Sequence, residues 1–290
     1  MRSIIPLVFL SIFIIACNST GTQRVESSKK STSMDNLKSI AKQAQTAFFK
    51  TYNEADMRTY FTENYIQHNP HVPTGLTPVL EILPTLKKAG LTCTTHRMLQ
   101  DGDFIVMHNT YDNAEVFGAK EMIAFDVWRM ENGKVAEHWD GLTTVVAETA
   151  SGRSQTDGST TITDLEKTAE NKALVKNFVT DVLVEGQTDK IPEYVSATQY
   201  DQHNPMVKDG LAGLNEAIQH LVSINDMFVY KKLHRVFGEG NFVVTQSEGE
   251  WHGKPQVFYD LFRVDAGKIV EHWDVIQEIP AEMAHANGMF

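Results

Sequence analysis

Three ionisable side chains recur in this chain at one spacing. They are Asp126, His138 and Asp140 and, 134 positions further on, Asp260, His272 and Asp274. Carboxylates and imidazoles exchange protons near neutral pH when burial or a neighbouring charge shifts their pKa values. One carboxyl of each pair can stay protonated as a donor while the other acts as a base. These six residues are therefore the candidate catalytic groups for general acid/base chemistry.

The recurring residues belong to a longer internal repeat. Residues 125–140 align with residues 259–274 without a gap. Another segment, Tyr-x-Gln-His-Asn-Pro, occurs at 65–70 and again at 200–205. Because the motifs keep the same order in both halves, the sequence predicts a duplicated domain.

The repeat sets the expected domain boundaries. We expect one domain at 35–150 and a second at 164–290, joined by a linker at 151–163 that is rich in Ser, Thr and Gly. In each domain helical patterns come first and a run of strands follows, which predicts an α+β fold. The sheet must curl over the helices to bury their apolar faces. Pro84 is expected to kink or shorten the third helix of the first domain.

The start of the chain has the pattern of an export signal. Residues 1–17 combine a short basic end with an apolar run of about a dozen residues, which is too short to span a bilayer of ~30 Å. Ile-Ala-Cys17 resembles the lipobox of bacterial lipoproteins, in which the cysteine is lipidated; the alternative is an ordinary signal peptide. The polar residues 18–34 are expected to form a flexible tether. The resemblance implies a lipid-anchored envelope protein, on the periplasmic face of the outer membrane if the cell is Gram-negative.

Charge and cysteine content narrow the possible partners. The formal net charge is −11, and no basic run offsets it, so we expect neither nucleic acid nor an anionic membrane surface as a partner. The lipid anchor would then be the sole membrane attachment. If Cys17 carries the lipid, Cys93 is the remaining thiol, and no internal disulfide is expected.

The loop of the repeated hairpin decides which side chains share a face. A two-residue turn would turn His138 away from Asp126, whereas a three-residue loop ending in Gly133 would pair them. The second copy has Ala266 in this loop, and alanine is poor at the positive φ that a two-residue type I′ turn requires. We therefore expect the three-residue loop, which gathers the three chemical groups on one otherwise apolar face.

The motifs resemble those of the SnoaL-like branch of the NTF2-like superfamily. Gln-His-Asn-Pro, Asp-x-[Trp/Phe]-Arg, Gly-Lys and Glu-His-Trp-Asp occur in this order in both copies. The resemblance implies two tandem cone-shaped α+β barrels, each with three helices packed on a strongly curved antiparallel sheet around a deep apolar pocket. SnoaL-like polyketide cyclases catalyse an intramolecular aldol condensation with an aspartate as acid/base, and ketosteroid isomerase and scytalone dehydratase share the fold.

The resemblance also suggests roles for the aspartates. The oxyanion-stabilising aspartate of ketosteroid isomerases falls on Asp126 and Asp260. Asp140 or Asp126 would act as acid/base in the first copy, and Asp274 or Asp260 in the second. Which aspartate does which task stays open.

Histidines are the expected donors or orienting groups. His138 and His272 lie beside the aspartates, and His68 and His203 are expected to reach the pocket mouth. In the alternative interpretation, His68 and His203 are turn residues whose rings bond backbone groups.

A metal site is the main rival explanation for a His/Asp cluster. His68 and His71 could join His138 and Asp140 as ligands, but the second copy has Met206 where the first has His71. The sequence shows no Gly-rich phosphate loop, nucleophile elbow or Cys/His pair. We therefore expect neither a metal nor an organic cofactor.

Two functions follow from these residues. The first is a cofactor-independent acid/base enzyme for aldol condensation or cyclisation, isomerisation or dehydration of a small carbonyl compound at the cell envelope. The alternative is a non-catalytic lipoprotein that binds a small apolar ligand or a partner protein. Members of this superfamily commonly dimerise through their sheets. The two copies are thus expected to form an intramolecular pseudo-dimer, with Trp139 and Trp273 between them.

Overall fold

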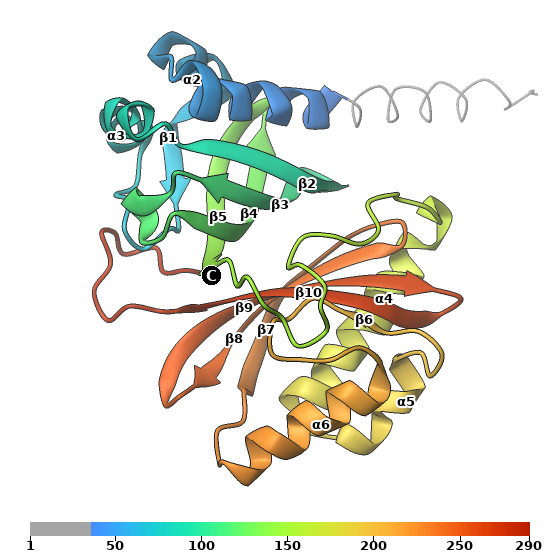
Figure 1. Cartoon of the computed structure of the whole chain (residues 1–290). Helices are drawn as coiled ribbons and strands as arrows, with labels where there is room; N and C mark the ends of the chain where they lie inside the picture. Colours follow the sequence, from blue (N-terminus) through green and yellow to red (C-terminus); the bar gives the residue numbers. More distant parts are fainter. Residues whose placement is uncertain (1–35) are drawn as a thin grey trace, which may run out of the picture.

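The computed structural model describes residues 36–290. The expected signal peptide, Cys17 and the tether at 18–34 lie outside these residues. No helix within 36–290 is both long and apolar enough to cross a membrane. The described part consists of two domains of the same design, one above the other in Figure 1.

The first domain places its helices mainly ahead of a five-stranded sheet. A helix at residues 36–46 runs directly into the first of the following elements. They are η1 (Ala47–Thr51), α2 (Glu54–Tyr60), β1 (Phe61–Gln67), α3 (Leu76–Ala89), β2 (Thr92–Asp101), β3 (Phe104–Asp112), η2 (Glu115–Phe117), β4 (Glu121–Glu131) and β5 (Lys134–Thr144).

The second domain repeats this order with more short helical turns before its first strand. Its elements are η3 (Leu165–Lys167), α4 (Thr168–Phe178), η4 (Val179–Val184), η5 (Thr188–Lys190), α5 (Ile191–Tyr194), β6 (Asp201–Gln202), α6 (Gly210–Ser223), β7 (Val229–Glu239), β8 (Phe242–Trp251), β9 (Lys254–Asp265) and β10 (Lys268–Glu278).

The two sheets have the same topology. Their strand orders are β1-β5-β4-β3-β2 and β6-β10-β9-β8-β7. The first strand of each domain is parallel to the last strand, and all other neighbours are antiparallel. The α+β class and the tandem duplication are therefore confirmed.

The long helix of each domain covers the concave side of its sheet. In α3 the buried residues recur every three or four positions, as Leu76, Val79, Leu83 and Leu86. Gly90 ends α3 in the left-handed conformation, with φ of 70°. Pro84 does not shorten the helix, since α3 and α6 both contain 14 residues. Burial of the apolar stripe offsets the hydrogen bond that the proline removes.

The hairpin loop differs from the sequence prediction. β4 and β5 are joined by a two-residue turn with positive φ at Asn132 and Gly133, and Ala266 takes the same conformation in the second domain, with φ of 47°. Ala136 is then an extra residue on β5, because the pairing shifts between Arg129 and Met130. A bulge of one residue reverses which face each later side chain occupies. The predicted three-residue loop is therefore wrong, but the prediction that Asp126, His138 and Asp140 share one face is correct.

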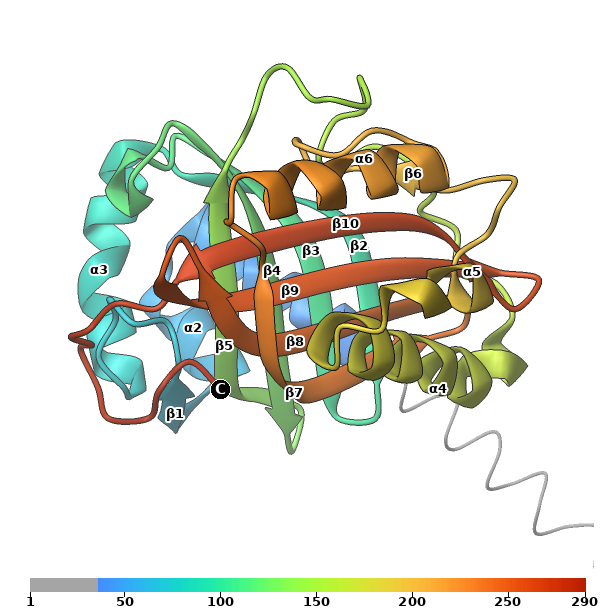
Figure 2. The same ribbon diagram turned by 90° about the horizontal axis from the view of Figure 1, so that it is seen from below.

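The two sheets pack against each other and leave the helices outside. Both views show this layering, and the strands of the second sheet cross those of the first in Figure 2. A buried apolar cluster joins the sheets and includes Phe125, Val127 and Leu261. Trp139 and Trp273 lie in the same cluster, 3% and 0% exposed. Each pocket face therefore points away from the interface, toward its own helices.

Candidate functional site

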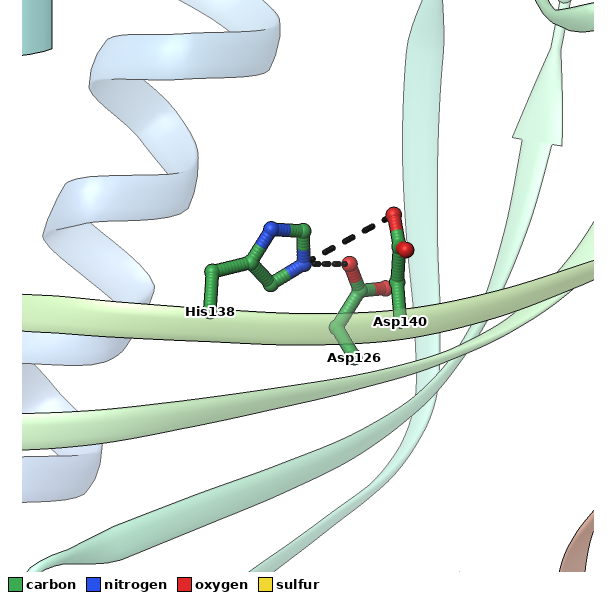
Figure 3. A group of neighbouring side chains, drawn as sticks. All are labelled: Asp126, His138 and Asp140. Carbon is green, nitrogen blue, oxygen red and sulfur yellow. Dashed lines mark hydrogen bonds and ion pairs between the residues drawn. The ribbon is translucent and has the colours of Figure 1, made fainter. Parts of the chain in front are cut away.

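In the first domain the hairpin brings two aspartates and a histidine together. Asp126 on β4 pairs with Asp140 on β5, and His138 lies two residues before Asp140. The Nε2 atom of His138 is 2.9 Å from Asp126 Oδ1 and 3.9 Å from Asp140 Oδ2, as drawn in Figure 3. We call such a group an Asp-His-Asp cluster.

The second domain repeats the cluster with nearly the same geometry. Asp260 on β9 pairs with Asp274 on β10. The Nε2 atom of His272 lies 3.0 Å from Asp260 Oδ1. Asp274 is only half-buried, whereas Asp140, its counterpart, is 6% exposed. The same chemistry is therefore more accessible in the second domain.

A second repeated segment orients the first cluster. Tyr65, Gln67 and Asn69 all line the pocket, because residues two apart in an extended chain point to the same side. Gln67 Oε1 accepts from His138 Nδ1 at 2.9 Å, and Asn69 Nδ2 donates to Asp140 Oδ2 at 2.7 Å. We call these three side chains the orienting arm of the first domain.

The second domain has the same orienting arm, formed by Tyr200, Gln202 and Asn204, all of which line its pocket. Gln202 Oε1 lies 2.9 Å from His272 Nδ1. Asn204 Nδ2 lies 2.6 Å from Asp274 Oδ2. Both arms therefore fix the histidine and the C-terminal aspartate of their cluster.

His68 and His203 do not lie in the pockets, so the prediction that they reach the pocket mouth is wrong. Alternation along the extended segment turns them to the opposite face, where each ring stacks on a tryptophan at 4.6 Å. His68 Nδ1 bonds the carbonyl of Gly288, and His203 Nδ1 bonds that of Ser154. The alternative interpretation, a ring that bonds backbone groups, describes them.

Hydrogen bonding sets the protonation of His138. Gln67 Oε1 also accepts the backbone N–H groups of His68 and Asn69, each at 2.9 Å, so the amide oxygen faces the ring. Because an amide oxygen only accepts, His138 Nδ1 must carry a proton. Burial alone would lower the pKa of His138, but the charge of Asp140 and the hydrogen bond to Asp126 raise it above its ordinary value. The second proton, on Nε2, then points at Asp126.

Asp126 is surrounded by donors. Its Oδ2 accepts from Asn109 Nδ2 at 2.7 Å and from the hydroxyl of Tyr111 at 2.5 Å. These hydrogen bonds fix the position of the Asp126 carboxyl group. In the second domain the hydroxyl of Tyr230 lies 3.2 Å from both oxygens of Asp260. Asp126 and Asp260 are therefore the hydrogen-bonded partners of His138 and His272.

The remaining aspartate is the exchangeable group. Burial raises the pKa of Asp140 and that of Asp274 to about 6, against the opposing effect of the neighbouring histidine. Asp140 Oδ1 is buried without a hydrogen-bond partner in the described structure. A carboxyl with such a pKa takes up and releases a proton close to neutral pH. This aspartate has the properties of a general base.

The two pockets differ in size. The cavity of the first domain has a volume of about 60 Å³, and that of the second about 270 Å³. One bulk water molecule occupies roughly 30 Å³, and a dry cavity of about 150 Å³ is known to bind benzene. The first cavity therefore has room for a few waters at most, and the second can hold an organic ligand.

One cause of this difference is visible on β3 and β8. Tyr111 lines the first pocket and stacks with Phe49 at a centroid distance of 5.3 Å. The matching strand position in the second domain is Gly249, and the hydroxyl that reaches the aspartate comes instead from Tyr230 on β7. The second pocket thus keeps the hydrogen bond without the ring at that position.

Comparison with known proteins places the first domain in a family. Residues 43–138 match the SnoaL-like domain profile. The first domain is a SnoaL-like domain. The second domain has the same sheet order, the same cluster and the same orienting arm, so it repeats the fold and the site of the first.

Solved structures with similar domains come from several bacteria. TsrD of Streptomyces laurentii is 16% identical, with a TM-score of 0.32, over 37% of this chain and 88% of its own. A candidate polyketide cyclase of Bacillus cereus is 17% identical (TM-score 0.32; 37% and 74% covered). A candidate ketosteroid isomerase of Kribbella flavida is 14% identical (TM-score 0.33; 39% and 81% covered). Among curated proteins, none matches the chain.

Each domain has, among its described residues, one group that could hold a metal ion. Ligand atoms of each Asp-His-Asp cluster lie within 4.8 Å of one another. The ligand set considered from the sequence is not brought together, because His68 faces the domain interface and His71 is exposed. In the first domain, hydrogen bonds to Asp126 and Gln67 already occupy both ring nitrogens of His138.

The orienting arms are the functional residues that the sequence reasoning missed. The Tyr-x-Gln-His-Asn-Pro repeat is present in the sequence, but only its histidine was predicted as a site residue. The signal was the spacing of Tyr, Gln and Asn, two residues apart before a proline, where an extended chain presents alternate side chains to one face.

Proposed function

We propose that the second domain is a cofactor-independent acid/base site that moves a proton next to the carbonyl of a small, mostly apolar compound. One observation carries the proposal: Asp274, with a pKa of about 6, borders a cavity of about 270 Å³. Aldol condensation or cyclisation, isomerisation and dehydration all begin with such a proton transfer, so any of them fits.

The lining of the pocket narrows the ligand. Among the described residues that line it, none is Lys or Arg, and most are aliphatic or aromatic. A carboxylate or phosphate on the ligand would find no Lys or Arg there and would face two aspartates beside the single imidazolium of His272. The ligand that fits best is neutral, has an apolar body of about two rings, and carries one carbonyl.

Three groups divide the chemistry. The carboxylate of Asp274 removes the proton from the carbon next to the carbonyl, and the C–H electrons pass into an enolate. Tyr200 accepts a hydrogen bond from Gln202 Nε2 at 3.3 Å, which leaves its own proton for the enolate oxygen. Burial raises the pKa of Tyr200 above its usual range, so the hydroxyl stays protonated. The ion pair of His272 and Asp260 lies beside Asp274 and stays in position during this step.

A binding function without catalysis is the second candidate, and the first domain favours it. This domain keeps the complete Asp-His-Asp cluster beside a cavity of only about 60 Å³. A cluster retained where a substrate has no room could serve to hold the hairpin rather than to react. Under this function the second pocket would store or carry a small apolar ligand.

The cell envelope is the proposed location of either function. The support is the sequence of residues 1–17 with Cys17 in a lipobox-like context. Metabolic labelling with a fatty acid analogue, compared with a Cys17→Ser variant, tests it. Label that persists in the variant would refute the anchor.

Solvent deuterium uptake tests the catalytic proposal. The protein is incubated in D₂O with a bicyclic ketone such as 2-tetralone, and deuterium next to the carbonyl is followed by mass spectrometry. The proposal predicts uptake well above the buffer rate. Binding of the ketone with no gain in exchange would favour the binding function instead.

A further inference from the structure

The segments that follow the last strand of each domain are themselves repeats. Ala-Glu-Thr-Ala at 147–150 follows β5, and Ala-Glu-Met-Ala at 281–284 follows β10, 134 positions later. Each segment leaves its own domain and lies on the other one. In Figure 1 the linker crosses the second domain, while the C-terminal segment runs beside the first. We call them the first tail (145–163) and the second tail (279–290).

The second tail forms hydrogen bonds with four consecutive residues, 67–70, of the segment that carries the first orienting arm. Three backbone carbonyls and the ring of His68 make these four contacts. These are Asn287 Nδ2 to Gln67 O at 2.9 Å, Gly288 O to His68 Nδ1 at 2.8 Å, His285 Nε2 to Asn69 O at 2.8 Å, and Ala284 N to Pro70 O at 2.8 Å. Met289 anchors the tail between the sheets, 1% exposed.

The first tail makes the corresponding contacts on the second domain. Ala150 N donates to Pro205 O at 2.8 Å, and Ser154 O lies 2.7 Å from His203 Nδ1. The positions match those of the second tail, since Ala150 corresponds to Ala284 and Ser154 to Gly288. The exchange is therefore reciprocal, as in a symmetric dimer whose two interfaces are equivalent.

The contact between tail and orienting arm affects the site because each arm lies at the edge of its sheet. β6 comprises only two residues and pairs with β10 alone. The tail lies on the side of the segment opposite the pocket. Gln202 and Asn204, whose side chains hold His272 and Asp274, have His203 between them, and the tail holds His203. The tail thus limits the positions that the arm can take.

We propose that each tail is a positioning element for the other domain's site: the first tail holds the arm that orients Asp274, and the second tail holds the arm that orients Asp140. Neither site is complete within its own domain. The proposal concerns the geometry of the clusters and stands whether or not the second pocket catalyses a reaction.

Two glycines of the first tail provide a matched pair of variants. Gly158 has φ of 88°, and a Cβ there would lie 2.0 Å from Glu271 Oε1 and 3.0 Å from His203 Nε2. Gly152 has φ of 77°, with no atom within 4 Å of its Cβ position. Both substitutions carry the cost of a left-handed alanine, and only Gly158→Ala pushes the tail off the arm.

The carboxyl titrations of Asp140 and Asp274 report arm position directly. In protein labelled with ¹³C-aspartate, each resonance is assigned by its Asp→Asn variant. The hydrogen bond from the arm asparagine lowers the pKa of each aspartate. Gly158→Ala should therefore raise the midpoint of Asp274 by about one pH unit and leave Asp140 unchanged. Gly152→Ala should change neither.

The second tail supplies the reciprocal experiment. Asn287→Ala removes the bond to Gln67 O and should raise the midpoint of Asp140 while leaving that of Asp274 unchanged. A crossed pattern, in which each variant shifts only the aspartate of the other domain, supports the proposal. Equal shifts at both aspartates, or no shift in either variant, would overturn it. If Gly158→Ala does not fold, Asn287→Ala decides alone.

Discussion

The amide nitrogen of Asn204 lies 2.6 Å from Oδ2 of Asp274. This bond links the two repeated motifs of the chain, since Asn204 belongs to the Tyr-x-Gln-His-Asn-Pro segment and Asp274 to the hairpin. Asn69 and Asp140 make the same bond at 2.7 Å in the first domain. Each proposed base is thus held by a side chain from outside the hairpin that carries it.

The proton-transfer rate of the second domain should have a bell-shaped pH dependence. Asp274 must be ionised to act as base, so the rate should rise through about pH 6. Its neighbour His272 must stay charged. Burial lowers the pKa of His272, but the hydrogen bond to Asp260 and the charges of Asp274 and Asp260 together raise it above its ordinary value. The rate should fall as pH rises above that value. Deuterium uptake measured from pH 4.5 to 9 checks both the rise and the fall of the rate. A rate that does not change with pH would contradict the roles given to Asp274 and His272.

Asp140→Asn should stabilise the protein at pH 8 and not at pH 4. The folded-state pKa of Asp140 is about 6, above the unfolded value near 3.9. Its stabilising contribution is present below the unfolded pKa and is lost as pH rises through the folded pKa. Removing the buried charge should then raise the free energy of unfolding at pH 8 by about 1–3 kcal/mol.

Urea unfolding of Asp140→Asn at the two pH values measures this difference. The control is Asp103→Asn, whose carboxyl is exposed in the same domain. A loss of stability at pH 8 that equals the loss at pH 4 would show that Asp140 carries no unfavourable charge.

Phe49→Ala should give the first domain a binding site. The ring of Phe49 lines the cavity of about 60 Å³ and stacks on Tyr111. Its removal enlarges a cavity whose polar groups are already in place. Calorimetric titration with 2-tetralone should change from one site per chain to two. Leu214→Trp, which fills the second cavity, should abolish binding in the wild-type background and leave one site in Phe49→Ala. Unchanged binding in Leu214→Trp would contradict the assignment of the occupied pocket.

Arg97 should contribute more to stability than Arg235, although their positions in the interface correspond. Their guanidinium groups lie 4.1 Å above the ring of Trp273 and 4.4 Å above that of Trp139. Arg97 also donates to three carbonyls of residues 156–159 and is 4% exposed. Arg97→Met should cost about 2–4 kcal/mol and Arg235→Met about 1 kcal/mol. Denaturant unfolding of the two variants compares them, and equal costs would refute the ranking.

Much of the fold could be predicted from the sequence because the chain is a repeat. Two copies of one pattern fix which segments are equivalent, and the class follows from helices that precede strands. The prediction also assigned the side chains of the hairpin to the correct faces, although it assumed the wrong loop length. The predicted three-residue loop and the observed two-residue turn with a bulge at Ala136 differ in register by two positions. A shift of two positions leaves each side chain on the same face of the sheet.

Other features depend on tertiary packing that local patterns do not contain. His68 was expected at the pocket mouth, yet alternation along the extended segment turns it toward Trp139. The unequal cavities follow from side chains on different strands, such as Tyr111 in one domain and Tyr230 in the other. The exchanged tails could have been noticed as the Ala-Glu-x-Ala repeat, but their destination is decided by how the two sheets pack.

The most direct test of the central claim compares deuterium uptake in two aspartate variants. Each variant replaces one proposed base with its uncharged analogue, and the two differ only in which domain they affect. If Asp274 is the base of the larger pocket, Asp274→Asn should lower the exchange rate of 2-tetralone by roughly 10²–10⁴-fold, while Asp140→Asn leaves it within about twofold of wild type. Equal exchange in wild type and Asp274→Asn would contradict the account.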